Sequence, residues 1–168
     1  MKRIILLSFL LIFLSSCSIY NLSNFIIPDD LEFLICIEKL DSPRKIIDYI
    51  IDNFEYKYHA LKSIDPYTLW KTKKGDCDNF SAFAVFVANF HGYETYQIKV
   101  MMKLFYGHVF AIYKEGNKYS FSSNFDYYEP EYNSFREIVE YFFNEEDVEW
   151  TKYIVYDYWN NKVEIGYN

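Results

Sequence analysis

The sequence predicts an α+β domain in which helices come first and an antiparallel sheet follows. Up to Gly92 the apolar residues recur mainly at helical spacing, and after it they gather in short runs rich in Tyr, Val, Ile and Phe. The chain has 168 residues, of which 51% are hydrophobic and 22% aromatic. This length allows one domain with a substantial core, and this composition is far too apolar for a disordered chain.

Residues 1–16 have the pattern of a secretory signal peptide. Two basic residues precede the apolar run 4–14, which is too short to span a membrane, and two serines follow before a cleavage point. The segment "LSSC" at 14–17 resembles the lipobox of bacterial lipoprotein precursors. That resemblance implies that Cys17 is lipidated, becomes the first mature residue and anchors an exported protein to the bacterial cell envelope. The alternative is an ordinary signal peptide in which Cys17 is incidental.

The remainder divides into a tether, 17–30, and a single domain, 31–168. Residues 31–40 predict a short helix that contains Cys36. The next helix begins at Ser42, a good N-cap, with Pro43 in its first turn. Its expected apolar face consists of Ile46, Ile47, Ile50, Ile51 and Phe54. A polar loop is expected from about 57 to 75.

A third helix begins in "GDCDNF" and ends at Gly92, a typical helix stop. The runs 94–104, 106–114 and 118–124 then predict strands, with "KEGNK" as the turn between the last two. A helix over 134–146 and a strand over 150–159 complete the expected elements. They place one thiol, Cys77, at a helix start.

The charge of the chain excludes one class of partner. A formal net charge of −7 and a pI near 5.0 argue against nucleic acid, which binds clustered Lys and Arg. "KTKK" at 71–74 is the only basic run and is typical of a solvated loop. We expect no cofactor and no metal: the carboxylates are dispersed, and no Cys-x-x-Cys or His pair has the spacing of a zinc site.

Cys77 has the setting of a nucleophile. A thiol at a helix N-terminus faces backbone N–H groups and the positive end of the helix dipole, which favour the thiolate. The same N–H groups can stabilise an oxyanion that forms on a substrate carbonyl. Of the three histidines, His108 lies near the start of a predicted strand that could run beside this helix end, whereas His59 lies in a loop and His91 at the far end of the helix.

Other interpretations of these residues remain open at this point. Buried free cysteine is common as a small hydrophobe, although the polar neighbours of Cys77 weaken that interpretation. A disulfide between Cys36 and Cys77 is compatible with an exported protein. A single histidine in an aromatic strand, such as His108, is usually a hydrogen-bonded core residue.

The ordered set of motifs resembles the transglutaminase-like superfamily of papain-fold cysteine enzymes over roughly residues 40–126. The matching motifs are Gly75-Asp76-Cys77 at a helix start, "HGY" (91–93) at the helix end, Gly107-His108 at a strand start and "GNKY" (116–119) in a hairpin. The resemblance implies a papain-like fold with Cys77 as nucleophile and His108 as base. It also implies a third catalytic residue, which orients the histidine.

The third member is where this sequence departs from the family pattern. The family's acid falls in "SFSSNFDYY", where strict register lands on Ser123. Asn124 beside it could orient an imidazole without supplying charge, as in Cys-His-Asn triads, and Asp126 is the rival candidate.

The activity that the resemblance implies is acyl transfer on an amide or peptide bond of a peptide or protein substrate, most simply by a peptidase or amidase. Two alternatives are a protein-crosslinking transglutaminase and a catalytically inactive surface lipoprotein that binds a peptide or partner. Trp70 and Tyr67, in the loop before Cys77, are candidates to wall the substrate cleft, with packing on the core as the competing interpretation.

Overall fold

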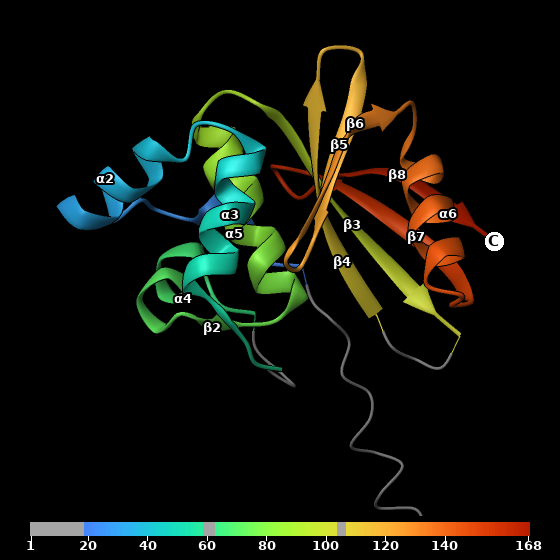
Figure 1. Cartoon of the computed structure of the whole chain (residues 1–168), viewed down its shortest axis with the longest axis horizontal. Helices are drawn as coiled ribbons and strands as arrows, with labels where there is room; N and C mark the ends of the chain where they lie inside the picture. Colours follow the sequence, from blue (N-terminus) through green and yellow to red (C-terminus); the bar gives the residue numbers. More distant parts are fainter. Residues whose placement is uncertain (1–18, 59–62, 104–106) are drawn as a thin grey trace, which may run out of the picture.

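The computed structural model describes residues 19–58, 63–103 and 107–168 and has a helical half and a sheet half (Figure 1). The helical half consists of η1 (Leu22–Asn24), α2 (Leu31–Lys39), α3 (Pro43–Asn53), β1 (Glu55–Tyr56), α4 (Pro66–Thr72), β2 (Lys74–Gly75) and α5 (Cys77–Phe90). The sheet half consists of β3 (Glu94–Met102), β4 (Gly107–Glu115), β5 (Lys118–Ser123), β6 (Asp126–Tyr132), α6 (Phe135–Glu145), β7 (Trp150–Asp157) and β8 (Lys162–Tyr167). The α+β class predicted from the sequence is confirmed.

The six long strands form one antiparallel sheet in the order β6-β5-β4-β3-β7-β8. Helix α5 packs on one face and α6 on the other (Figure 1). Side chains of the central strand β4 alternate between the two: Ala111 and Tyr113 join the α5 core, whereas Phe110 and Ile112 join the α6 core. The direction of each side chain on β4 therefore decides which helix it meets.

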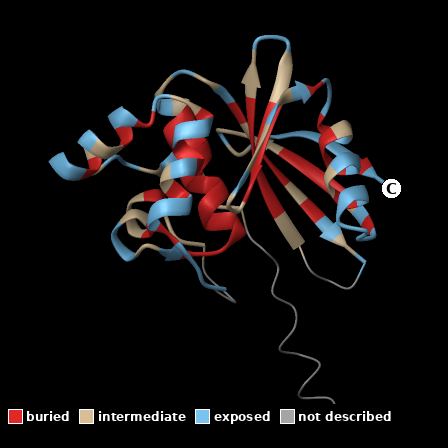
Figure 2. Cartoon of the chain, in the orientation of Figure 1, coloured by how far each residue is buried: buried red, intermediate tan, exposed pale blue. Residues whose placement is uncertain are grey.

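Helix α5 is the centre of the first core and is buried along nearly its whole length (Figure 2). Such a helix needs apolar residues all round, and "FSAFAVFVA" provides them with small residues where the sheet approaches closely. The helix ends at the C-cap His91, and Gly92 follows with φ +86°, a left-handed conformation that glycine adopts at little cost.

Helix α3 forms as its N-terminal signals predict. The Ser42 hydroxyl accepts a hydrogen bond from the Lys45 N–H at 3.4 Å, and Pro43 occupies the first turn. Its buried residues include Ile46, Ile47 and Ile50. Ile51, expected on the same apolar face, is instead 50% exposed, because it lies on the solvent edge of that face.

Four elements and the expected tether differ from the expectations. Helix α4 and the short strand β2 lie within the expected loop 57–75; Asp65 caps α4 by accepting from the Thr68 N–H at 2.8 Å. Strands β6 and β8, at the two edges of the sheet, were not expected. The expected tether 17–30 packs on the domain where it is described, because Leu22 is only 3% exposed and the Phe25 ring meets Phe86 at 5.0 Å.

The segment 1–16 and the expected lipidation residue, Cys17, lie outside the described residues. Within the described ranges, no helix is both long enough and apolar enough to cross a membrane.

Candidate functional site

The backbone that leads into Cys77 is held by a short parallel ladder. Strand β1 pairs with β2, and the N–H of Lys57 donates to the carbonyl of Gly75 at 2.6 Å. A β-carbon added at Gly75 would lie 2.7 Å from Leu69 Cδ1 and 2.9 Å from Asn79 Cβ. The glycine of the Gly-Asp-Cys motif is therefore required by close packing between α4 and the first turn of α5.

Cys77 is the first residue of α5, and its helix start is closed by a capping box. The Asp76 side chain accepts from the backbone N–H of Asn79, whose Oδ1 accepts from the Asp76 N–H at 3.2 Å. Cys77 itself is 7% exposed. The arrangement fixes the thiol at the positive end of a long buried helix, which is the electrostatic setting that favours a thiolate.

Asp78 follows Cys77 and carries a strongly shifted carboxyl group. Burial raises the pKa of Asp78 to about 9, with further contributions from a hydrogen bond to Asp76, the charge of Asp76 and Cys77. At neutral pH this carboxyl group is therefore protonated. The Asp78 carboxyl group therefore adds no negative charge that would oppose a thiolate.

His108 lies on the opposite side of the sheet from α5. Its ring stacks on Phe142 of α6 at 5.6 Å with an interplanar angle of 9°, and it meets Phe110 edge-on at 4.8 Å. Its Nε2 lies 2.8 Å from the Ser123 hydroxyl oxygen. The His108 ring therefore faces α6, whereas Cys77 starts the helix that packs on the other face of the sheet.

Asn124 and Asp126 line the same pocket as His108. Ser123 pairs directly with Asp126, so Asn124 and Phe125 form a two-residue hairpin turn, with Asn124 at φ 51°. Asparagine tolerates this left-handed conformation well, which gives Asn124 a role in the turn. The Phe125 ring packs on Phe80 of α5 at 5.2 Å.

A pocket of about 320 Å³ opens on the α6 side of the sheet. It is lined by polar residues from strands β4 to β6 and by apolar residues of α6 and its neighbours: Met102, His108, Ser123, Asn124, Asp126, Phe142, Phe143, Glu146 and Val148. Three of the four predicted catalytic residues thus share one pocket, without the thiol. The sequence predicts a helix over 134–146, which contains Phe142 and Glu146, but local sequence does not show which strand residues that helix meets.

The other histidine that the structure describes is remote from the thiol. His91 caps the far end of α5, where its Nε2 lies 2.8 Å from the Ile37 carbonyl oxygen. His59 lies outside the described residues. Among the described histidines, therefore, neither is placed beside Cys77.

Tyr67 and Trp70 lie on α4 and pack against the helical half. The Tyr67 hydroxyl donates to Asp30 Oδ2 at 2.6 Å, and Trp70 meets Phe33 at 5.3 Å. These contacts favour the interpretation that both residues pack within the domain. No contact described here supports a role for them in a substrate cleft. Cys36 and Cys77 are not joined by a disulfide, so the disulfide interpretation does not hold in this structure.

Part of this chain is similar to a known family. Residues 36–100 match the family model of the transglutaminase-like superfamily. No curated protein matches the sequence. Among solved structures, the calcium-bound form of Legionella pneumophila LapG has a TM-score of 0.49 and 10% sequence identity, covering 73% of this chain and 70% of that one. A second LapG structure has a TM-score of 0.47 and 10% identity, covering 79% of each chain.

Proposed function

We propose that this protein acts on amide or peptide bonds through Cys77, because residues 36–100 match the family model of the transglutaminase-like superfamily, a superfamily of cysteine-type enzymes. The observation that carries the proposal is the position of Cys77 as the first residue of α5, within the matched segment. Hydrolysis by a peptidase or amidase is the simplest form of this activity, with a peptide or protein as substrate.

The proposed reaction is a two-step acyl transfer. The Cys77 thiolate attacks the carbonyl carbon, and N–H groups at the start of α5 stabilise the oxyanion of the tetrahedral intermediate. The C–N bond then breaks, the leaving amine takes up a proton from water, and a thioester remains. Water releases the carboxylic acid and regenerates the thiol; attack by a lysine amine instead would form a crosslink.

In the proposed reaction Cys77 is the nucleophile, and His108 is not required as its base. For His108 to serve as the base, its ring would have to leave Ser123 and Phe142 and cross the end of the sheet. In the arrangement described, the helix N-terminus and the neutral Asp78 carboxyl group support a thiolate without that histidine.

Alkylation of the full-length protein with iodoacetamide tests the thiol, with Cys36 as the internal reference. Peptide mass spectrometry follows each cysteine separately across pH 5 to 9. We expect Cys77 to react faster than Cys36 near neutral pH, with a midpoint below the value of about 8.5 for a free thiol. If Cys77 reacts more slowly than Cys36 at every pH, the proposed nucleophile is excluded.

A second function is favoured by the position of His108. A member of this superfamily that has lost its catalytic pair would keep the fold and bind a peptide or partner without cleaving it. The ring of His108 on the α6 face, and Ser123 where the family pattern has an acid, support this alternative. The two functions differ in whether a thioester forms: intact-mass analysis after mixing with an activated peptide ester shows a covalent adduct at Cys77 only for the enzyme.

We further propose that the protein is exported and lipid-anchored through Cys17. The support is the signal-like segment 1–16 and the sequence "LSSC" that ends at Cys17. Removal of residues 1–16 would shift the formal net charge from −7 to −9, so attachment to an anionic membrane would depend on the acyl chains and not on a basic surface. Metabolic labelling with a fatty acid should mark the wild-type protein and not Cys17→Ser; equal labelling of both would refute the anchor.

A further inference from the structure

Helix α2 has apolar residues on two opposite sides. Phe33 and Ile37, one turn apart, are fully buried in the core of the helical half. Leu31 and Ile35 are also one turn apart, but they lie on the opposite side of the helix, where Leu31 is 71% exposed and Ile35 is exposed as well. The buried pair accounts for the packing of α2 on the domain. Packing among the described residues does not account for the second apolar side.

The segment before α2 adds to this exposed apolar side. Ile26 is 86% exposed and Ile27 is exposed too, although the neighbouring Phe25 packs on Phe86 of α5. Single exposed apolar residues are ordinary, but a group of them marks an interaction surface. We call this group the N-terminal apolar patch; it consists of Ile26, Ile27, Leu31 and Ile35.

The turn in the middle of the patch is held to the domain. Asp30 caps α2 by accepting hydrogen bonds from the N–H groups of Glu32 and Phe33, at 3.1 Å each. Its Oδ2 accepts from the Tyr67 hydroxyl at 2.6 Å and pairs with Lys71 Nζ at 3.1 Å. These contacts join the start of α2 to α4 and hold the exposed residues on either side of Asp30 at the surface.

The patch is close along the chain to the proposed lipid anchor, Cys17. Five residues lead from Cys17 to Leu22, which is buried in the domain, and a fully extended chain of that length spans at most about 18 Å. The same length of chain leads from Leu22 to Ile27. A domain of this size has a radius of gyration of about 15 Å. An acylated Cys17 therefore keeps the domain against the lipid headgroups, with the patch near the point of attachment.

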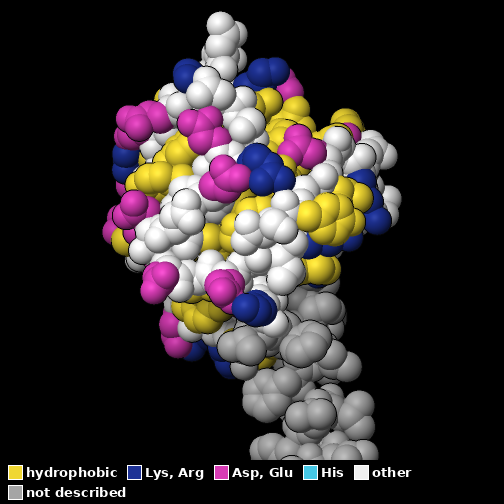
Figure 3. Space-filling model, turned by 90° about the vertical axis from the view of Figure 1, so that its right-hand side faces the viewer, with side chains coloured by type: hydrophobic (Ala, Val, Ile, Leu, Met, Phe, Trp, Pro, Cys, Tyr) yellow, Lys and Arg dark blue, Asp and Glu magenta, His cyan; other side chains and the backbone are white. Residues whose placement is uncertain are grey.

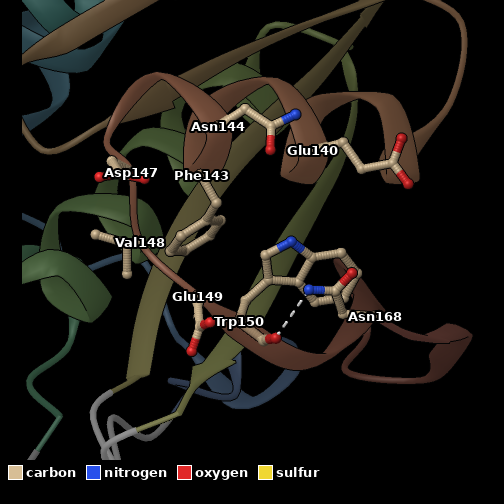
Figure 4. A pocket seen from close by; sticks show the side chains of 8 residues that line it. All are labelled: Glu140, Phe143, Asn144, Asp147, Val148, Glu149, Trp150 and Asn168. Carbon is tan, nitrogen blue, oxygen red and sulfur yellow. Dashed lines mark hydrogen bonds between the residues drawn. The ribbon is translucent and has the colours of Figure 1, made fainter.

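The opposite end of the molecule differs in character. Helix α2 and the C-terminus lie at the two ends of the long axis (Figure 1). On the face with α6 and the C-terminus, charged side chains of both signs lie between the apolar ones (Figure 3). A pocket there, beside Trp150, is bordered by the exposed acids Glu140, Asp147 and Glu149 (Figure 4). Carboxylates are costly to bury in lipid, so this end suits water and the α2 end suits a bilayer.

The patch has the chemistry of a shallow contact with lipid. The exposed acids Asp29 and Glu32 lie beside it, so anionic headgroups do not attract it. Branched aliphatic side chains gain free energy when they leave water for the acyl region, whatever the charge of the headgroups. The contact is therefore apolar and should be insensitive to salt.

We propose that the N-terminal apolar patch inserts into the surface of the lipid bilayer to which Cys17 attaches the protein. The domain then has one orientation on the membrane, with α2 against the lipid and the α6 end turned towards water. This inference rests on the proposed lipid anchor and does not depend on catalysis at Cys77.

Quenching of tryptophan fluorescence by brominated lipid tests the contact. The mature protein, purified from membranes, is reconstituted in phosphatidylcholine vesicles with and without bromine on the acyl chains. Leu31→Trp reports on the patch and Tyr167→Trp on an exposed position next to the C-terminus; the wild-type signal is subtracted from each. We expect about half of the fluorescence added by Leu31→Trp to be quenched, because interfacial helices lie about 5–10 Å deep, and that added by Tyr167→Trp to be unaffected. Equal quenching of the two, or none in Leu31→Trp, would overturn the proposal.

Matched double variants make the test specific. In the Leu31→Trp protein, Ile26→Ser with Ile27→Ser should lower the quenching about twofold, because it removes half of the apolar patch. Val163→Ser with Ile165→Ser removes two similarly exposed side chains from β8 and should leave the quenching unchanged. Sodium chloride at about 1 M should also leave it unchanged. An equal decrease in both double variants, or loss of quenching in salt, would contradict an apolar contact at the patch.

Flotation with the vesicles separates failure of the anchor from failure of the patch. We expect the wild type to float and Cys17→Ser to float far less. A wild type that does not float would refute the anchor and the inference together, whereas flotation without quenching at position 31 would refute the inference alone. Analytical ultracentrifugation of Cys17→Ser should show a monomer; a dimer that Ile26→Ser with Ile27→Ser dissociates would assign the patch to a second copy and overturn the membrane contact.

Discussion

The start of α5 and the pocket beside α6 are both built from motifs of the same resemblance, yet they are opposite in character. At the α5 start the polar side chains are buried: Asp76 and Asn79 form a capping box, and burial raises the pKa of Asp78 to about 9. At the α6 pocket the acidic side chains are exposed, as Asp126 and Glu146 are. The polar groups beside the thiol are therefore part of the core, whereas the acidic groups beside His108 are part of the surface.

The first way to sharpen this comparison is to remove one phenylalanine from each region. Phe80 is 2% exposed and contacts the Phe54 and Phe125 rings, so we expect Phe80→Ala to lower the free energy of unfolding by about 3–5 kcal/mol. Phe142 borders the pocket and is only partly buried, so Phe142→Ala should cost under about 3 kcal/mol. Urea unfolding measures the loss of stability in each variant. A larger loss for Phe142→Ala than for Phe80→Ala would contradict the assignment of the tighter core to α5.

The second test uses pH, because Asp78 is buried with its proton. Its pKa of about 9 lies above that of an unfolded aspartate, near 4, so between these values the folded state holds a proton that the unfolded chain has released. The stability linked to this proton is complete below about pH 4 and is lost as the pH rises towards 9.

Asp78→Asn removes that titration and keeps the shape of the side chain. We therefore expect the stability of the variant relative to the wild type to increase from pH 5 to pH 8. Urea unfolding of both proteins at the two pH values measures the change. A constant difference would mean that Asp78 does not keep its proton in the folded state.

The third test compares neighbouring serines that face the two sides of the sheet. The Ser122 hydroxyl lies 2.7 Å from that of Tyr113, which is fully buried on the α5 side, so Ser122→Ala should cost about 1–3 kcal/mol. Ser123→Ala should cost less than about 1 kcal/mol. The substitution removes the hydrogen-bond partner of His108 Nε2, but this nitrogen borders a pocket in which water can replace the lost hydroxyl. Thermal unfolding distinguishes them, and equal costs would show that the His108 side is as closed as the α5 side.

The smallest expected effect lies just beyond α6. Asp147 has φ 51°, and the N–H of Val148 donates to the Phe143 carbonyl oxygen at 3.1 Å, a helix ending that usually has glycine at this position. Asp147→Gly should raise the free energy of unfolding by up to about 1 kcal/mol, because it relieves the conformation and removes a negative charge from a negative helix end. A loss of stability in calorimetry would contradict this account of the α6 terminus.

Much of the fold could be predicted where the signals are local. Ser42 and Pro43 mark the start of α3, and Gly92 marks the end of α5, because caps and stops depend on adjacent residues. The edge strands β6 and β8 were not predicted, because their sequences lack the apolar pattern of a central strand. Strand β6 contains Pro130 and β8 contains Lys162 and Glu164, residues that suit strands exposed at an edge and not the apolar pattern of a central strand.

The face on which His108 lies could not be predicted from spacing. Strand β4 is buried on both sides, so Val109 and Ala111 are as apolar as Phe110 and Ile112 and the alternation gives no contrast between faces. The position of Cys77 at a helix start, by comparison, follows from local sequence alone. The candidate nucleophile was therefore predictable, while its distance from a histidine in another part of the chain was not.

The central claim is that Cys77 and His108 belong to different sites, and the alkylation rate of Cys77 in His108→Ala tests it most directly. With iodoacetamide at pH 7 and peptide mass spectrometry as the readout, we expect the rate constant of Cys77 in the variant to equal that of the wild type within about twofold. A decrease of about tenfold or more, with Cys36 unaffected, would show that the imidazole activates the thiol and would contradict the separation described here.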